Sequence, residues 1–150
     1  MHAPNPFKSY RQVATQTAPP GQLVLMLFDG ALKSLDCALL GFQCADFAER
    51  NLAVHNNLTR AIDIIRELNG SLDLAAGGQL AETLRNLYNY FDECINTSNF
   101  KKNPAGIREI IPMIRDLRDS WAAMLRKQDD GFITAAAVET NRLTTAHYAA

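Results

Sequence analysis

The sequence of 150 residues has few cysteines and only short apolar runs. Cys37, Cys44 and Cys94 are an odd number without a Cys-x-x-Cys pair, so they indicate neither a disulfide framework nor a zinc site. The longest apolar run covers residues 23–28, whereas a helix that crosses a bilayer needs about 20 apolar residues. The sequence therefore predicts no stable membrane insertion.

A secretory signal is also lacking, because the opening residues MHAPNPFKSYRQ contain prolines where a signal has a continuous apolar stretch. We therefore expect a cytoplasmic protein whose cysteines stay reduced. With 47% hydrophobic and 21% charged residues, the composition is that of an ordinary globular domain. A domain of this length buries roughly 70% of the surface of its unfolded chain, so it needs no covalent staples.

The net charge is only -1, but the charged residues are unevenly distributed along the chain. Residues 29–93 hold ten acidic and five basic side chains, whereas residues 101–128 hold seven basic and three acidic ones. This basic face leaves a nucleic-acid-binding or regulatory helical-bundle protein open as the alternative function. The cations alternate with acids and lack aromatic neighbours, which favours a solvated helix face and no nucleic-acid partner.

Helical periodicity is present throughout, and the alternation typical of strands is absent. Four amphipathic segments of about 20 residues are joined by short turns, which predicts an all-α, antiparallel, up-and-down four-helix bundle. We place the bundle at residues 1–128, with an extended or loosely helical N-terminal arm at 1–19 and a mobile, flexible C-terminal tail at 129–150. The segments begin at helix-start signals: Pro19 with Pro20, Asp46, Gly77 with Gly78, and Asn103 with Pro104.

The last segment contains Pro112, which lacks an amide donor and clashes with the preceding helical turn. A kink or a break is therefore expected there. A functional hinge is the alternative interpretation. Within the tail, residues 133–142 are the part with nascent helical character.

No motif for catalysis, metal binding or cofactor binding is present. Di-iron bundles use Glu-x-x-His, but Leu52 stands three residues before His55, and Thr144 three before His147. Walker loops and Gly-x-Ser-x-Gly are also missing. We therefore expect no enzyme, no metal and no cofactor. What the helices do have is apolar surface beyond one face each, which suits a groove for partner helices, although extra core or a homodimer face explains it equally well.

Several segments together resemble one family, the flagellin-specific export chaperones of the FliS family. They are YRQV at 10–13, TAPPGQLVLMLFDGA at 17–31, AIDIIREL at 61–68, SLD at 71–73, GGQLA at 77–81, LYNY at 87–90 and LRDSW at 117–121. The resemblance covers roughly residues 7–126 in the family's order and spacing. The second proline of the helix start and Pro112 depart from the family pattern.

The resemblance implies a cytosolic helical bundle without enzymatic activity that binds the C-terminal segment of newly made flagellin. It also implies that the chaperone prevents premature polymerisation and delivers flagellin to the export gate of the flagellar type III apparatus. A disordered client must bury a large apolar area to offset its ordering cost, so we expect a broad groove on outward apolar residues. We assign client binding to Leu23, Met26, Leu27, Val54, Ala61, Ile64, Ile65, Leu68, Leu84, Leu87 and Tyr88, each of which fits a core position equally well.

The N-terminal arm carries Phe7, Tyr10 and Val13 at three-residue steps. This spacing puts them on one side of a helical turn. We expect them to cover the client groove in the free protein, while direct contact of Tyr10 with the client remains the alternative. The sequence leaves open whether the free protein is a monomer or a homodimer.

Overall fold

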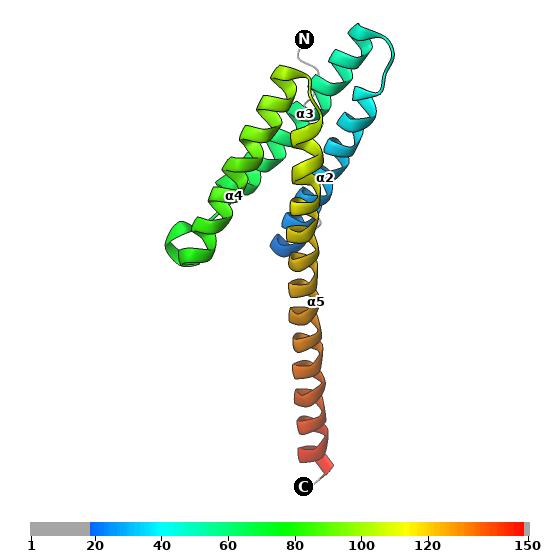
Figure 1. The fold of residues 1–150 in the computed structure, drawn as a ribbon. Helices are drawn as coiled ribbons and strands as arrows, with labels where there is room; N and C mark the ends of the chain where they lie inside the picture. Colours follow the sequence, from blue (N-terminus) through cyan, green and yellow to red (C-terminus); the bar gives the residue numbers. More distant parts are fainter. Residues whose placement is uncertain (1–18, 149–150) are drawn as a thin grey trace, which may run out of the picture. The chain divides into compact units, whose positions relative to one another are not determined.

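The structure is a computed structural model that describes the backbone of residues 19–148 and the side chains of residues 19–129. This part of the chain holds four helices and no strand (Figure 1). The expected all-α four-helix bundle is confirmed. Among the described residues, no helix combines the length and apolarity needed to cross a membrane. The helices are α2 (Pro20–Phe42), α3 (Phe47–Gly70), α4 (Leu74–Lys101) and α5 (Ala105–Tyr148).

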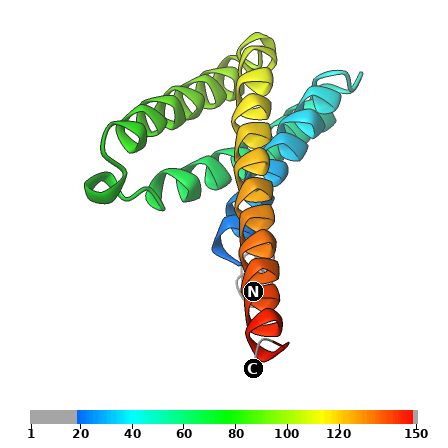
Figure 2. The same cartoon turned by 90° about the horizontal axis from the view of Figure 1, so that it is seen from below.

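The chain divides into two compact units, one ending at Arg118 and one beginning at Asp119. The first unit contains α2, α3, α4 and the start of α5, and α3 packs against both α2 and α4. Figures 1 and 2 show the α3–α4 connection at one end of this unit, with the α2–α3 and α4–α5 connections at the other. The up-and-down order of the helices follows from these short connections.

Three helix starts lie where the sequence predicts them. Helix α2 begins at Pro20, in the first turn where proline is tolerated. The Asp46 carboxylate accepts a hydrogen bond from the Glu49 amide at 2.8 Å, and Asn103 Oδ1 accepts one from the Ala105 amide at 2.9 Å. These caps satisfy amides that have no partner inside the helix, which is why they fix the starts.

Helix α4 starts one turn earlier than expected. Asp73 Oδ1 accepts hydrogen bonds from the amides of Ala75 at 3.1 Å and Ala76 at 3.0 Å, so a first turn forms before the glycine pair. Gly78 then interrupts the helix with φ 54° and ψ -134°. The glycine signal therefore marks the start of the longer part of α4, and the capping role of Asp73 escapes the sequence pattern.

The expected break at Pro112 does not occur, because α5 is helical on both sides of it. Proline removes the amide that would bond to the Arg108 carbonyl, but Pro112 and Arg108 are both exposed, so water can hydrate that carbonyl. Neighbouring Ile111 and Ile114 are buried, and this burial holds the helix in place. The backbone stays helical as far as Tyr148, a longer stretch than residues 133–142; mobility of the tail remains a prediction.

The core combines side chains from all four helices. Burying a large aliphatic or aromatic side chain contributes about 1.5–3 kcal/mol, so this set dominates the stability of the bundle. A Cβ added to Gly41 would lie 3.1 Å from the Ala53 Cβ, which shows how closely α2 and α3 approach. The largest fully buried side chains are Phe91, Leu35, Leu58, Ile65, Leu68, Ile95, Ile107, Ile110, Ile114 and Val54.

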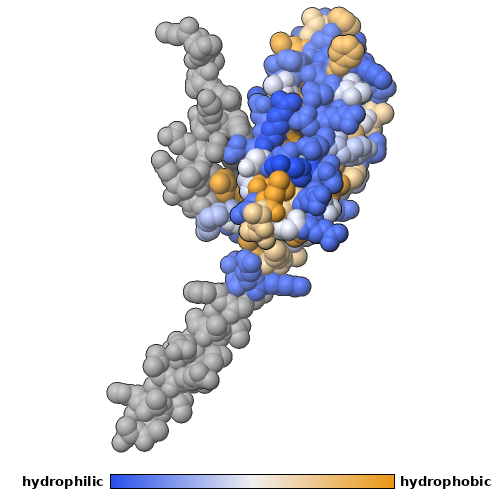
Figure 3. Space-filling view, turned by 90° about the vertical axis from the view of Figure 1, so that its left-hand side faces the viewer, coloured by the Kyte–Doolittle hydropathy of each residue, from blue (hydrophilic) through white to orange (hydrophobic). Residues whose placement is uncertain are grey.

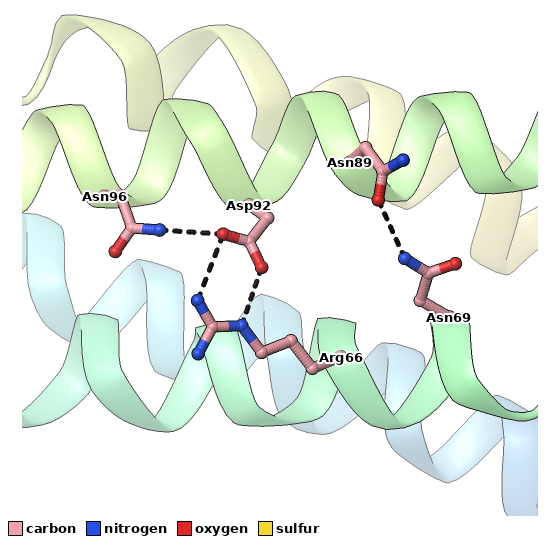
Figure 4. Close-up of polar contacts among 5 residues, drawn as sticks. All are labelled: Arg66, Asn69, Asn89, Asp92 and Asn96. Carbon is pink, nitrogen blue, oxygen red and sulfur yellow. Dashed lines mark hydrogen bonds and ion pairs between the residues drawn. The ribbon is translucent and has the colours of Figure 1, made fainter.

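A row of polar side chains joins the outer edges of α3 and α4 (Figure 4). Arg66 donates to both carboxylate oxygens of Asp92, at 2.7 Å and 3.3 Å, and Asn96 donates to the same carboxylate at 2.7 Å. One turn away, Asn69 donates to Asn89 at 2.9 Å. Exposed pairs of this kind contribute about 0–1 kcal/mol each, so the row adds little to the stability that the buried core provides.

Candidate functional site

A groove of about 490 Å³ runs along the seam between α2 and α3. The α2 residues recur at three- and four-residue steps on one face of the helix, and the α3 residues do the same on the facing helix. The lining residues are Met26, Leu27, Asp29, Gly30, Lys33, Ser34 and Cys37 from α2, with Asn57, Arg60 and Ile64 from α3.

The groove has an apolar floor and a charged rim. Leu27 and Ile64 are buried at its base, whereas Lys33 and Arg60 are exposed at its edge. A Cβ added to Gly30 would lie 3.3 Å from the Ile64 Cδ1, so the missing side chain keeps this part of the seam open. Such a floor suits apolar side chains of a peptide, and the rim suits a client with acidic flanks.

The acidic part of the rim is engaged within the protein. The Asp29 carboxylate accepts a hydrogen bond from Arg118 Nε at 2.8 Å, which ties α2 to the start of α5. Asn57 donates to the Ala53 carbonyl of its own helix at 2.8 Å. In the part of the chain that the structure describes, no group of three or more His, Cys, Asp or Glu side chains could hold a metal ion.

The structure brings three of the expected client-binding residues together in this groove, namely Met26, Leu27 and Ile64. Three others are half-buried outside it: Leu23, Leu84 and Leu87. The remaining five are buried between the helices: Val54, Ala61, Ile65, Leu68 and Tyr88. The structure therefore gives these five a packing role in the protein on its own, and their contact with a client remains a prediction.

Tyr88 illustrates the buried set. Its side chain is 3% exposed, and its ring centroid lies 6.5 Å from that of Phe91. Burial raises the pKa of its phenol to about 12. A phenol in this environment contributes to the interior of the bundle, not to an open groove.

Sequence reasoning missed the small and polar lining of the groove. Ser34 and Cys37 follow Gly30 at helical steps beside the apolar stripe of α2, and Asn57 and Arg60 precede Ile64 in the same way on α3. The sequence signal for these lining residues is their position beside the apolar stripe of each helix, at the same helical spacing. The arm residues Phe7, Tyr10 and Val13 lie outside the described residues.

Comparison with known proteins identifies the family. The sequence model of the family described as flagellar protein FliS matches residues 3–128. The chain belongs to the FliS family. That match contains every residue that lines the α2–α3 groove and stops before residues 129–150.

Curated relatives from the FliS family agree in length and in name. The chain is 30% identical over 128 residues to a protein of Bacillus subtilis, covering 85% of this chain and 92% of the relative. It is 32% identical over 126 residues to a protein of Salmonella typhimurium, covering 81% and 90%, and 32% identical over 130 residues to a protein of Escherichia coli, covering 83% and 93%. All three are named flagellar secretion chaperone FliS. The FliS family is thus one of flagellar chaperones, not of enzymes.

Proposed function

We propose that this FliS-family chain binds the C-terminal segment of flagellin in the cytoplasm, prevents its premature polymerisation and delivers it to the flagellar export gate. The observation that carries the proposal is the α2–α3 groove, with its apolar floor and its place inside the family match. The names of the relatives, flagellar secretion chaperones, support an export-related client.

A client that folds as it binds must bury more apolar area than the groove supplies, so it needs contacts outside the groove. Coupled folding and binding typically buries about 1,000–3,000 Å², which is more surface than the ten residues lining the groove can supply. We propose that Leu23, Leu84 and Leu87, which keep part of their surface accessible, supply further contacts on α2 and α4. The client then contacts several faces of the bundle at once.

Isothermal titration calorimetry tests this function. Soluble flagellin should bind with about one-to-one stoichiometry, and flagellin lacking its last ~40 to 50 residues should not bind, because it lacks the segment that buries the apolar area. Equal affinity for both forms would contradict the proposal.

A pair of variants on α2 tests the groove itself. Met26→Asp puts a charge among the groove residues and should weaken flagellin binding about tenfold or more, since a buried unpaired charge is costly. Leu40→Asp makes the same chemical change on an exposed residue of α2 outside the groove and should leave the affinity unchanged. Equal losses in the two variants would remove the groove from the binding surface.

The alternative function, nucleic-acid binding through the basic start of α5, predicts a different dependence on salt. Phosphate contacts release counterions, so affinity for DNA or RNA falls steeply as salt rises. Binding through apolar surface changes little. A steep salt dependence with DNA or RNA, together with no binding of flagellin, would favour the alternative.

A further inference from the structure

The end of the bundle opposite the α3–α4 connection has a second surface that the flagellin proposal does not use. Here the last turn of α2, the start of α3, the last turn of α4 and the α4–α5 connection meet (Figure 1). Large apolar side chains are left in solvent: Phe100 is 90% exposed and Phe47 is 68% exposed, with Leu40 and Leu52 also exposed. Figure 3 shows hydrophobic residues at this upper end, above a largely hydrophilic face.

A pocket of about 370 Å³ lies at this end, which we call the end pocket. Its aromatic lining residues are Phe42 and Phe47, and its charged lining residues are Arg50, Lys102 and Arg108. No carboxylate lines it. None of the client-binding residues assigned from the sequence belongs to it, so the end pocket is distinct from the α2–α3 groove.

The cations of the end pocket are held in place but not neutralised. The Arg50 guanidinium lies 5.5 Å from the centroid of the Phe47 ring and donates to the Cys44 carbonyl at 3.3 Å. The Lys102 ammonium donates to the Asn99 side-chain oxygen. Among the described residues, Arg50, Lys102 and Arg108 have no carboxylate partner in an ion pair. Partial burial lowers the pKa of Lys102, as expected for a cation that lacks a nearby carboxylate.

We propose that the end pocket binds an acidic segment of a partner protein through its carboxylates, with an apolar or aromatic side chain of that segment inserted against Phe42 and Phe47. Charge complementarity selects the occupant, because every charged lining residue is cationic. The concavity accommodates an inserted side chain, and Phe47, a lining residue that is 68% exposed, offers it an accessible apolar surface. Aromatic residues and arginine are the side chains that most often dominate protein interfaces.

Other occupants fit these observations less well. The N-terminal arm carries Lys8 and Arg11 and no acidic residue up to residue 18, so like charges oppose its docking here. A membrane surface is broad, whereas these cations line a pocket. Nucleic acid needs a basic stripe, but Glu109 directly follows Arg108, and Asp116 directly follows Arg115.

Fluorescence anisotropy with a defined set of labelled peptides tests the proposal. Each peptide has six Asp or Glu residues around one central Phe, Trp or Leu; controls replace the central residue by Ser or the acids by Lys. We expect at least one acidic peptide to bind, and its affinity to fall about tenfold in Arg108→Glu and in Phe47→Ser, because charge attraction or apolar contact is lost. Arg115→Glu makes the same charge change two turns along α5, outside the end pocket, and should change affinity less than twofold.

Several results would overturn the proposal. They are equal binding of acidic and basic peptides, equal losses in Arg108→Glu and Arg115→Glu, or no acidic peptide that binds more tightly than its Ser control. Preferential binding of vesicles with anionic lipid, or of RNA, would assign the end pocket to another class of partner. Self-association abolished by Arg108→Glu would assign it to a second copy of the chain. Flagellin binding by Arg108→Glu should stay at the wild-type level, so this test fails or succeeds separately from the proposed function.

Discussion

At the scale of single residues, burial distinguishes side chains that the same helical periodicity places on the apolar stripes of their helices. Ile65 on α3 is 1% exposed, whereas Leu87 on α4 keeps part of its surface in solvent. A fully packed side chain contributes mainly to stability, since removing it leaves a cavity. A half-buried one can also contact a client. The same helical periodicity produces both, so their roles differ only through the rotation of each helix in the bundle.

Ile65→Ala should lower the free energy of unfolding by about 2–5 kcal/mol, because it opens a cavity in the core. Leu87→Ala should cost less stability, since part of that side chain is already in water, and should weaken flagellin binding instead. Chemical denaturation run alongside calorimetry separates the two effects. A Leu87→Ala variant with a full core penalty and unchanged affinity would exclude Leu87 from client binding.

Tyr88 gives the protein a predictable weakness at alkaline pH. Burial raises the pKa of its phenol from 10.0 to about 12, so folding favours the protonated form. This contribution to stability is complete below pH 10 and is lost as pH rises toward 12. Between these values, the wild type should lose about 2 kcal/mol more than Tyr88→Phe, which has no phenol to ionise. Urea unfolding of both proteins across this range measures the difference, and parallel pH profiles would contradict the assignment.

At the scale of elements, helix starts could be predicted from the sequence because their causes are local. An aspartate or an asparagine at a start accepts hydrogen bonds from amides within three residues, as the caps at Asp46 and Asn103 confirm, and a proline there fixes its own φ at a helical value. The location of the α2–α3 groove could not be predicted, since it depends on how each helix turns toward its neighbour. Pro112 does not break α5 because of tertiary packing, which the local sequence does not show. Burial of the neighbouring isoleucines outweighs one lost hydrogen bond.

Two glycines of the α3–α4 region should respond in opposite ways to alanine. Gly78 has φ 54° and ψ -134°, a backbone conformation that side chains with a Cβ rarely adopt, so Gly78→Ala should cost about 1 kcal/mol or more. Gly70 ends α3 without a positive φ and has open space where a methyl group would be added, so Gly70→Ala should be neutral or slightly stabilising. Thermal unfolding of the two variants distinguishes the cases, and equal shifts in Tm would contradict the strain at Gly78.

At the scale of the whole molecule, a protein with an apolar groove for a client must stay soluble when no client is bound. Exposed apolar surface favours aggregation, so we expect the α2–α3 groove to be covered in the free protein. The N-terminal arm is the cover we expect, with Phe7, Tyr10 and Val13 as its anchors. A client that binds the same surface must displace the arm, which lowers the apparent affinity.

Deleting residues 1–16, or making Tyr10→Ala, should therefore strengthen or speed flagellin binding and make the free protein dimerise or precipitate more readily. Association kinetics and light scattering provide the two measurements. Lys8→Ala changes the same arm without removing an anchor and serves as the control. Slower association of Tyr10→Ala with unchanged solubility would mean that the arm contacts the client directly.

The free thiol of Cys37 turns the α2–α3 groove into a chemically addressable position. Cys37 lines the groove and is half-buried, whereas Cys44, also half-buried, lies in the connection between α2 and α3, outside the groove. The alkylation rates of the two native thiols can thus be measured in one sample, without an engineered label. Bound flagellin should slow the labelling of Cys37 while that of Cys44 continues at its original rate, so peptide mass spectrometry can follow occupancy of the native protein over time.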